Sequence, residues 1–275
     1  MTLYTINQKF QAAPAGRVAE PCGARMLKVA EMFGIGLDES YEVTLYRDLC
    51  IDVRPGDVVF ITGPSGSGKS VLLRNLAQAI QGTRIVDLTA IREADAATNA
   101  AARRPVIDLM GGPLEQALRL LSAAGLADAF LLLRTPQELS DGQRYRLRLA
   151  LALDALLGDA AEVRQVRNAE CGMRNGKTKS KTATNPDGLL RTVTEAGAPK
   201  VLVADEFCST LDRLCARAVA YRVRRLATTH GITVLAASAH DDLVEDLAPD
   251  VLVVKHEASG TEVAYADPSR AEVQP

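Results

Sequence analysis

The segment from residue 63 to residue 70 has the composition of a phosphate-binding loop. Its residues are Gly63, Pro64, Ser65, Gly66, Ser67, Gly68, Lys69 and Ser70. They fit the pattern G-x-x-x-x-G-K-[ST], in which glycines let backbone N–H groups face a phosphate. Lys69 adds positive charge toward the outer phosphates, and the Ser70 hydroxyl can hold Mg²⁺. A Gly/Ser-rich linker is the alternative interpretation, which the Lys-Ser ending disfavours.

The segments on both sides of this loop support the same interpretation. Residues 57–62 are an apolar run of strand length, and a helical pattern begins at Val71, which we include in the candidate site. A strand, a loop and a helix in this order are what the motif requires. The helix N-terminus adds its dipole to the predicted anion site.

Two adjacent acids, Asp205 and Glu206, follow the apolar segment 201–204. This order is typical of a central strand that ends at the edge of an active site. Asp205 would lie within reach of Mg²⁺, directly or through water, and Glu206 would polarise an attacking water. The alternative is a pair of exposed acids after a core strand, which the phosphate loop in the same chain disfavours.

A third segment, Leu139-Ser140-Asp141-Gly142-Gln143, precedes a predicted helix over 141–157. Ser140 suits an N-cap, and Gly142 allows close approach of a ligand to the backbone. The segment resembles the signature motif Leu-Ser-Gly-Gly-Gln of the ATP-binding-cassette (ABC) ATPases. A free helix start is a second candidate anion site in the chain.

Further motifs of that family follow in the family's order, and the resemblance covers about residues 41–257. Residues 209–212, which end in Asp212, resemble the D-loop, and His240 resembles the switch histidine. Tyr41 is a candidate for stacking on adenine. A capping or surface role for His240 and a half-buried strand position for Tyr41 are the alternatives.

The resemblance implies Mg²⁺-dependent ATP hydrolysis in a transient dimer of cassettes that encloses two ATP molecules head to tail. The implied catalytic residues are Lys69, Glu206 and His240, and the implied metal ligands are Ser70 and Asp205. The partner's nucleotide would be closed off by Ser140, Gly142, Gln143 and Asp212. The implied fold is α/β: a P-loop NTPase cassette with a mainly parallel sheet, an antiparallel edge and a reduced helical subdomain.

Several residues depart from the family pattern. Phe207 replaces the usual proline, and Asp141 places a negative charge where the partner's γ-phosphate would dock. No glutamine stands at the expected Q-loop, so Asp108 is the candidate substitute and a further candidate at the metal. The missing glutamine and the small helical subdomain argue against a transporter role, because both features engage the membrane subunits in transporters.

Strands and helices alternate along the chain, which favours a parallel sheet covered on both faces. We predict a lead-in over 1–40 and a cassette over 41–270 with its helical subdomain at about 104–158. Strands are predicted at 41–45, 49–53, 57–62, 84–88, 200–204 and 232–238, with a hairpin over 251–266. Helices are predicted at 24–33, 113–124 and 211–229. The apolar face of helix 113–124 would consist of Leu114, Ala117, Leu118, Leu121 and Ala124, with Gly125 as its cap.

An insertion at about 159–198 separates the signature helix from the Asp205 strand. From Arg164 to Arg191 it holds seven basic residues and two acids. A solvated loop is one interpretation, and a contact to the phosphate backbone of nucleic acid is the other. The absence of aromatic residues in the basic segment disfavours recognition of single strands.

The composition is consistent with a cytoplasmic protein. The net charge is −2, and five cysteines without a C-x-x-C pair indicate reduced thiols rather than disulfides or zinc. We find neither a membrane span nor a secretory signal.

Within the ABC ATPases, the motifs resemble a soluble group often fused to a GNAT-type acetyltransferase, here as the cassette alone. Three functions remain open. The cassette would act on a nucleic-acid or protein partner, serve as the ATP-binding subunit of a transporter, or be a nucleotide-dependent binding module with little turnover.

Overall fold

The computed structural model describes residues 3–12, 24–34, 41–80, 84–91, 104–158, 199–256 and 260–273. The chain divides into two compact units, Leu3–Ile51 and a larger unit that begins at Asp52. The predicted basic insertion 159–198 lies outside the described residues. The predicted domain limits at residues 41 and 270 stay predictions.

The smaller unit contains strands β1 (Leu3–Ala12) and β2 (Tyr41–Asp52), which pair in a two-stranded sheet, and helix α1 (Ala24–Phe33). Helix α1 occupies the predicted residues. The prediction of two strands at 41–45 and 49–53 is wrong, because β2 is continuous. Asp48 has a φ of 48°, and its N–H donates to the side chain of Asn7 over 2.7 Å. This bond holds the left-handed residue within the strand, so the strand does not break there.

The larger unit is built on a six-stranded sheet in the order β4-β5-β6-β3-β7-β8. The strands are β3 (Val58–Thr62), β4 (Arg84–Asp87), β5 (Lys200–Ala204), β6 (Ile232–Ser238), β7 (Val251–Lys255) and β8 (Thr261–Tyr265). The neighbouring strands from β4 through β5, β6 and β3 to β7 are parallel to one another, and β8 pairs antiparallel with β7. The predicted parallel sheet with an antiparallel edge is confirmed.

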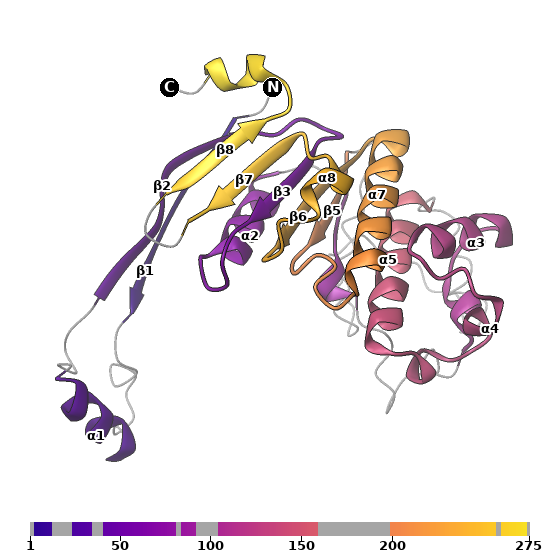
Figure 1. The fold of residues 1–275 in the computed structure, drawn as a ribbon, viewed down its shortest axis with the longest axis horizontal. Coiled ribbons are helices and arrows are strands. Elements are labelled where there is room, and N and C mark those ends of the chain that lie inside the picture. Colours follow the sequence, from indigo (N-terminus) through magenta and orange to yellow (C-terminus); the bar gives the residue numbers. More distant parts are fainter. Residues whose placement is uncertain are drawn as a thin grey trace, which may run out of the picture. The chain divides into compact units, whose positions relative to one another are not determined.

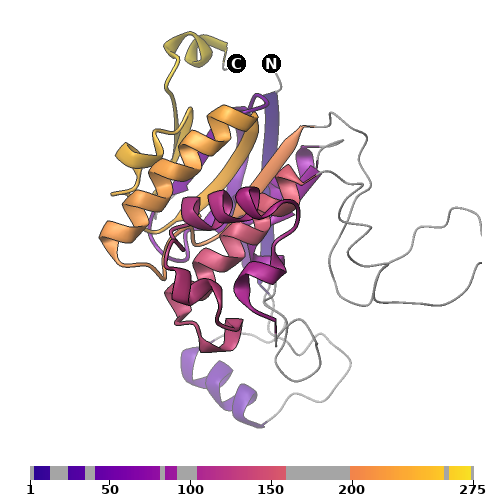
Figure 2. The same ribbon diagram turned by 90° about the vertical axis from the view of Figure 1, so that its right-hand side faces the viewer.

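Helices cover both faces of this sheet (Figures 1 and 2). Helix α2 (Lys69–Ala79) lies on one face, and the longer helices α5 (Asp141–Leu157) and α7 (Arg213–His230) lie on the other with the short α8 (Val244–Leu247). Every residue of β3 and β6 is buried. Burial on two faces explains why these strands are continuous apolar runs in the sequence rather than alternating ones.

In the helical subdomain, α3 (Leu114–Ala123) packs against α5, and the short α4 (Ala129–Leu132) packs against the turn Val106–Leu109. The predicted face of α3 is partly wrong. Leu114 is 64% exposed and Leu118 40% exposed, whereas Leu120 is buried beside Leu121. The face of α3 that contacts the core is narrower than the apolar pattern in the sequence, so Leu114 and Leu118 lie outside it and are exposed to solvent. Gly125, with a φ of 88°, ends the helix region as predicted.

Short 3₁₀ turns complete the described elements at Leu88–Ala90, Val106–Leu109, Pro136–Glu138 and Pro268–Val273. The last of them brings Arg270 to the segment that precedes β3. Its guanidinium donates to Asp57 Oδ2 over 2.7 Å and to Asp52 Oδ2 over 3.2 Å. The side chains of Arg270 and Asp52 are almost fully buried. The Tyr265 ring lies 5.1 Å from the guanidinium, so the C-terminal turn clamps the segment before β3.

We expect Arg270→Met to lower the free energy of unfolding by about 3–5 kcal/mol, because it leaves the buried Asp52 carboxylate without its main partner. Arg54→Met is the matched control. Arg54 also pairs with Asp52 over 3.2 Å, but its side chain is 42% exposed, so its loss should cost less than about 1 kcal/mol. Urea unfolding of the three proteins checks this, and equal effects of the two variants would contradict the clamp.

Candidate functional site

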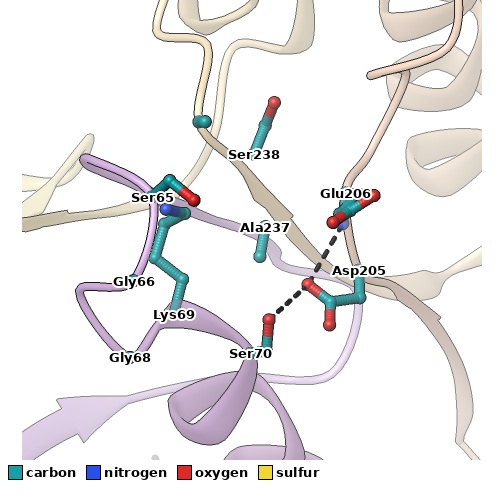
Figure 3. Close-up of a pocket in the computed structure, with 10 residues that line it drawn as sticks. Ser65, Gly66, Gly68, Lys69, Ser70, Asp205, Glu206, Ala237 and Ser238 are labelled. Carbon is teal, nitrogen blue, oxygen red and sulfur yellow. Dashed lines mark hydrogen bonds between the residues drawn. The ribbon is translucent and has the colours of Figure 1, made fainter.

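The predicted phosphate loop joins β3 to α2 in a conformation that depends on its glycines (Figure 3). The φ angles of Gly63, Gly66 and Gly68 are 144°, 79° and 96°, values that L-residues rarely adopt. At Gly63 the space is also closed, because a Cβ there would lie 2.2 Å from the carbonyl oxygen of Lys255. The loop backbone therefore passes against the end of β7 with no room for a side chain.

Lys69 turns its ammonium back onto this loop. Its Nζ donates to the carbonyl oxygens of Gly63 and Pro64 over 2.7 Å and 2.6 Å. Partial burial lowers the pKa of Lys69, and the nearby Asp205 and Glu206 oppose that shift. The Lys69 ammonium is thus bound by neutral backbone carbonyls of the loop. A bound phosphate can replace these carbonyls as the hydrogen-bond partner of the ammonium.

The order of the sheet brings the two acids to the loop. Strand β6 lies between β3 and β5, so residues that follow β3 and β5 meet across its end. The Ser70 hydroxyl donates to Asp205 Oδ1 over 2.9 Å. The Glu206 N–H donates to the same oxygen over 3.1 Å. Figure 3 shows both bonds, which unite the loop, the helix start and the acids in one site.

These groups border a hollow of about 250 Å³. It is lined by Ser65, Gly66, Gly68, Lys69, Ser70, Asp205, Glu206, Ala237, Ser238 and Ala239. The last three were not predicted as site residues: Ala237 and Ser238 end β6, and Ala239 directly follows it. Their signal in the sequence is a run of small residues at the carboxyl end of an apolar strand, where bulk would fill the space between the loop and the acids.

His240, Asp108 and Tyr41 are among the predicted site residues that do not line the hollow. His240 is exposed one residue beyond Ala239, and its N–H donates to the Ser238 hydroxyl over 3.2 Å. Asp108 is exposed in the turn Val106–Leu109 of the helical subdomain. Tyr41 opens β2, most of which belongs to the smaller unit. Their predicted roles stay predictions.

The signature segment forms the capped start of α5. The Ser140 hydroxyl accepts the Gln143 N–H over 3.4 Å, and Gln143 Oε1 accepts the Ser140 N–H over 2.9 Å. The predicted N-cap is therefore confirmed and is one half of a capping box. The charge of Asp141 is paired with Arg144 over 2.6 Å, which reduces the repulsion that the departure from the signature motif predicts.

The start of α5 also lies against the D-loop segment. A Cβ on Gly142 would meet Leu211 Cδ2 at 3.4 Å and the Thr210 carbonyl oxygen at 3.6 Å. Asp212 caps α7 through the Cys215 N–H, which it accepts over 3.0 Å. This cap explains why α7 begins at Arg213 rather than at the predicted residue 211.

The chemistry of the hollow fits a nucleotide phosphate with Mg²⁺. A glycine loop, a helix start and the Lys69 ammonium favour an anion. The Ser70 hydroxyl and the Asp205 carboxylate are hard oxygen donors, which Mg²⁺ prefers. Among the described residues there is no group of three or more His, Cys, Asp or Glu side chains that could hold a metal. A Mg²⁺ ion held by Ser70 and Asp205 would take its remaining ligands from phosphate and water.

The fold and the site together define a P-loop nucleotide-binding protein of the α/β class. A family model described as "ABC transporter" matches residues 46–103. The chain contains an ATP-binding cassette domain of the ABC type, as the motif order predicts.

Curated relatives support this assignment. The methionine import ATP-binding protein MetN of Cupriavidus metallidurans is 27% identical over 78% of this chain and 58% of its own length. MetN of Streptomyces coelicolor is 32% identical over 75% of this chain and 56% of its own length. The phosphonates import ATP-binding protein PhnC 2 of Cupriavidus necator is 27% identical over 86% and 81%. The chain spans little more than half the length of the methionine import proteins.

Solved structures match the fold. The post-hydrolysis ADP- and phosphate-bound dimer of the cassette MJ0796 matches with a TM-score of 0.52 and 15% identity, over 97% of this chain and 99% of that chain. A second dimeric structure of MJ0796, a bacterial ABC transporter cassette, matches with a TM-score of 0.50 and 16% identity, over 82% and 93%. In the described ranges, no helix has the length and apolar character needed to cross a bilayer.

We expect Gly63→Ala to disrupt the loop far more than Gly66→Ala. Both substitutions impose a positive φ on an L-residue, which costs about 1–2 kcal/mol. A Cβ at Gly63 would collide with the backbone of Lys255. A Cβ at Gly66 would have no atom of the described residues within 4 Å. The clash adds about 1–3 kcal/mol. Urea unfolding of both variants measures the difference, and similar losses would contradict the closed space at Gly63.

Proposed function

We propose that this cassette binds MgATP and hydrolyses it at an interface between two cassettes arranged head to tail. The observation that carries the proposal is the hydrogen bond of 2.9 Å from Ser70 to Asp205. It unites the phosphate loop with the acids around a single hollow that also includes Lys69 and Glu206. Phosphoryl transfer to water needs oxygen ligands for a metal, a cation beside the phosphates and a carboxylate near the attacking water. The oxygens of Ser70 and Asp205, the Lys69 ammonium and the Glu206 carboxylate are suited to these three roles.

Each side chain has a role in the proposed reaction. The Lys69 ammonium and the loop N–H groups would neutralise charge on the outer phosphates. Ser70 and Asp205 would hold Mg²⁺, which would stabilise the negative charge that develops on the phosphate oxygens. Glu206 would orient the attacking water and accept its proton. His240 would hydrogen-bond the γ-phosphate from the end of β6.

The second half of the site would come from another cassette. Ser140, Gly142 and Gln143 lie at the start of α5, and Asp212 lies at the start of α7. None of these four lines the hollow of its own chain. The capping box leaves the first turn of α5 ordered and able to receive an anion. A homodimer that forms with ATP is consistent with a site divided in this way.

As the partner that hydrolysis drives, we propose a membrane subunit of an importer, with the cassette in the cytoplasm. The names of the curated relatives, MetN and PhnC 2, favour this partner. Exposed apolar side chains in the helical subdomain favour it as well: Leu114, Leu118, Phe130 and Leu133. The missing Q-loop glutamine counts against it. Contact to nucleic acid through the basic insertion, or binding with little turnover, would be outcomes of the tests below.

We expect Glu206→Gln to bind MgATP within about threefold of the unsubstituted protein and to lose about 10²–10⁴-fold in turnover, because the base is removed while the phosphate site is kept. The variant should accumulate as a dimer with MgATP, measured by size exclusion with light scattering. Glu245→Gln, in the exposed part of α8, is the control. Full turnover of Glu206→Gln would refute the assignment of the base.

We expect the double variant Phe130→Asp, Leu133→Asp to keep its own ATPase rate while losing the stimulation that membranes of the host cell give. These side chains are 75% and 69% exposed, so charge there should leave the fold intact and remove an apolar contact. Tyr221→Asp on α7 is the control. Stimulation by DNA or RNA that falls steeply with salt would instead favour the nucleic-acid partner. Single-turnover product at background level would favour the binding module.

A further inference from the structure

A buried hydroxyl on the signature helix reaches the turn that carries Glu206. Tyr145 lies one turn into α5, and its side chain is almost fully buried. Its hydroxyl accepts the backbone N–H of Cys208 over 2.8 Å and donates to Cys208 Sγ over 3.9 Å. The hydroxyl therefore binds Cys208 through both its acceptor and its donor.

The turn after β5 needs such support because its backbone is unusual. Glu206 and Cys208 have φ angles of 51° and 58°, and residues other than glycine rarely adopt such values. Two further bonds hold the turn, from Phe207 N–H to the Ala237 carbonyl oxygen over 2.7 Å and from Ser209 N–H to the Glu206 carbonyl oxygen over 3.0 Å. The Tyr145 hydroxyl supplies the one bond among these that comes from the helical subdomain.

Both partners of this contact stay neutral. Burial raises the pKa of Tyr145 well above its usual value. Burial also raises the pKa of the Cys208 thiol to about 12, although the Tyr145 hydroxyl opposes the shift. The hydroxyl thus remains protonated through the physiological range, and the contact is a permanent part of the fold rather than a switch operated by pH.

We propose that Tyr145 is a positioning residue for Glu206, which fixes the carboxylate over the hollow and joins the signature helix to the catalytic turn of the same chain. This inference rests on the proposed hydrolysis by Glu206. The start of α5 would close the partner's nucleotide, while Glu206 acts on the nucleotide of its own chain. A shift of α5 on closure would therefore reach the water-positioning group of the other site through one hydrogen bond.

The test is Tyr145→Phe, which removes only the hydroxyl. We expect kcat to fall at least tenfold, while the Kd for MgATP and the KM change less than threefold, because Tyr145 is not among the residues that line the hollow. Tyr221→Phe, on the exposed side of α7, is the control and should match the unsubstituted protein. A kcat within twofold of the unsubstituted protein would overturn the proposal.

A double-mutant cycle shows whether Tyr145 acts through Glu206. If it does, adding Tyr145→Phe to Glu206→Gln should not lower the residual single-turnover rate further. Additive losses would mean that the hydroxyl acts elsewhere, and would overturn the proposal. A failure of the proposed function is distinct, because the unsubstituted protein would then show no turnover to lose.

Repeating the Tyr145→Phe substitution in a protein that carries Cys208→Gly separates loss of folding from loss of positioning. Cys208→Gly adopts a φ of 58° without strain, so its turn forms without being forced. We expect Tyr145→Phe to lower kcat in this background by a similar factor, with rates normalised to the fraction folded by near-UV circular dichroism. If kcat is unaffected there, the hydroxyl only compensates for strain, and the positioning role is wrong.

Discussion

The hydrogen bond between Ser70 and Asp205 is the contact on which the site depends, and it joins residues 135 positions apart in sequence. It exists because β6 lies between β3 and β5, so that two parallel strands deliver their carboxyl ends to the same edge of the sheet. One more strand between β3 and β5 would separate the loop from the acids by a further strand spacing of about 5 Å. Sheet topology, rather than any local motif, therefore brings the reacting groups together.

Groups that would bind phosphate are already engaged with one another. Lys69 binds loop carbonyls, Ser70 binds Asp205, and Ser140 shares a capping box with Gln143. A bound nucleotide would exchange these contacts for stronger ones to charged oxygens. Because the donors are held near their working positions, little side-chain freedom would be lost on binding. This preorganisation is consistent with a loop whose shape is fixed by glycines.

The sequence predicts the sheet well because its strands are buried on both faces and are bounded by charged or glycine residues. It also predicts the phosphate loop and the two acids, because each of these motifs consists of consecutive residues. It fails where tertiary contacts decide. Leu114 and Leu118 fit an apolar face but lie outside the narrow contact of α3 with α5. β2 stays continuous because Asn7, far away in sequence, holds Asp48. The bond of Tyr145 to Cys208 joins two motifs and has no signal within either.

The two ends of β3 differ in their surroundings: ion pairs hold its start, and a loop with unusual backbone angles follows its end. At its start, Asp250 accepts the Val58 N–H over 2.8 Å and pairs with Arg224 over 2.5 Å, while Arg270 holds Asp57. At its other end, the chain enters a loop with three positive φ angles. Strained or costly backbone persists only where surrounding structure over-determines it. The ion pairs at the start of β3 and the hydrogen-bonded turn after β5 supply that constraint, so the hollow keeps its shape.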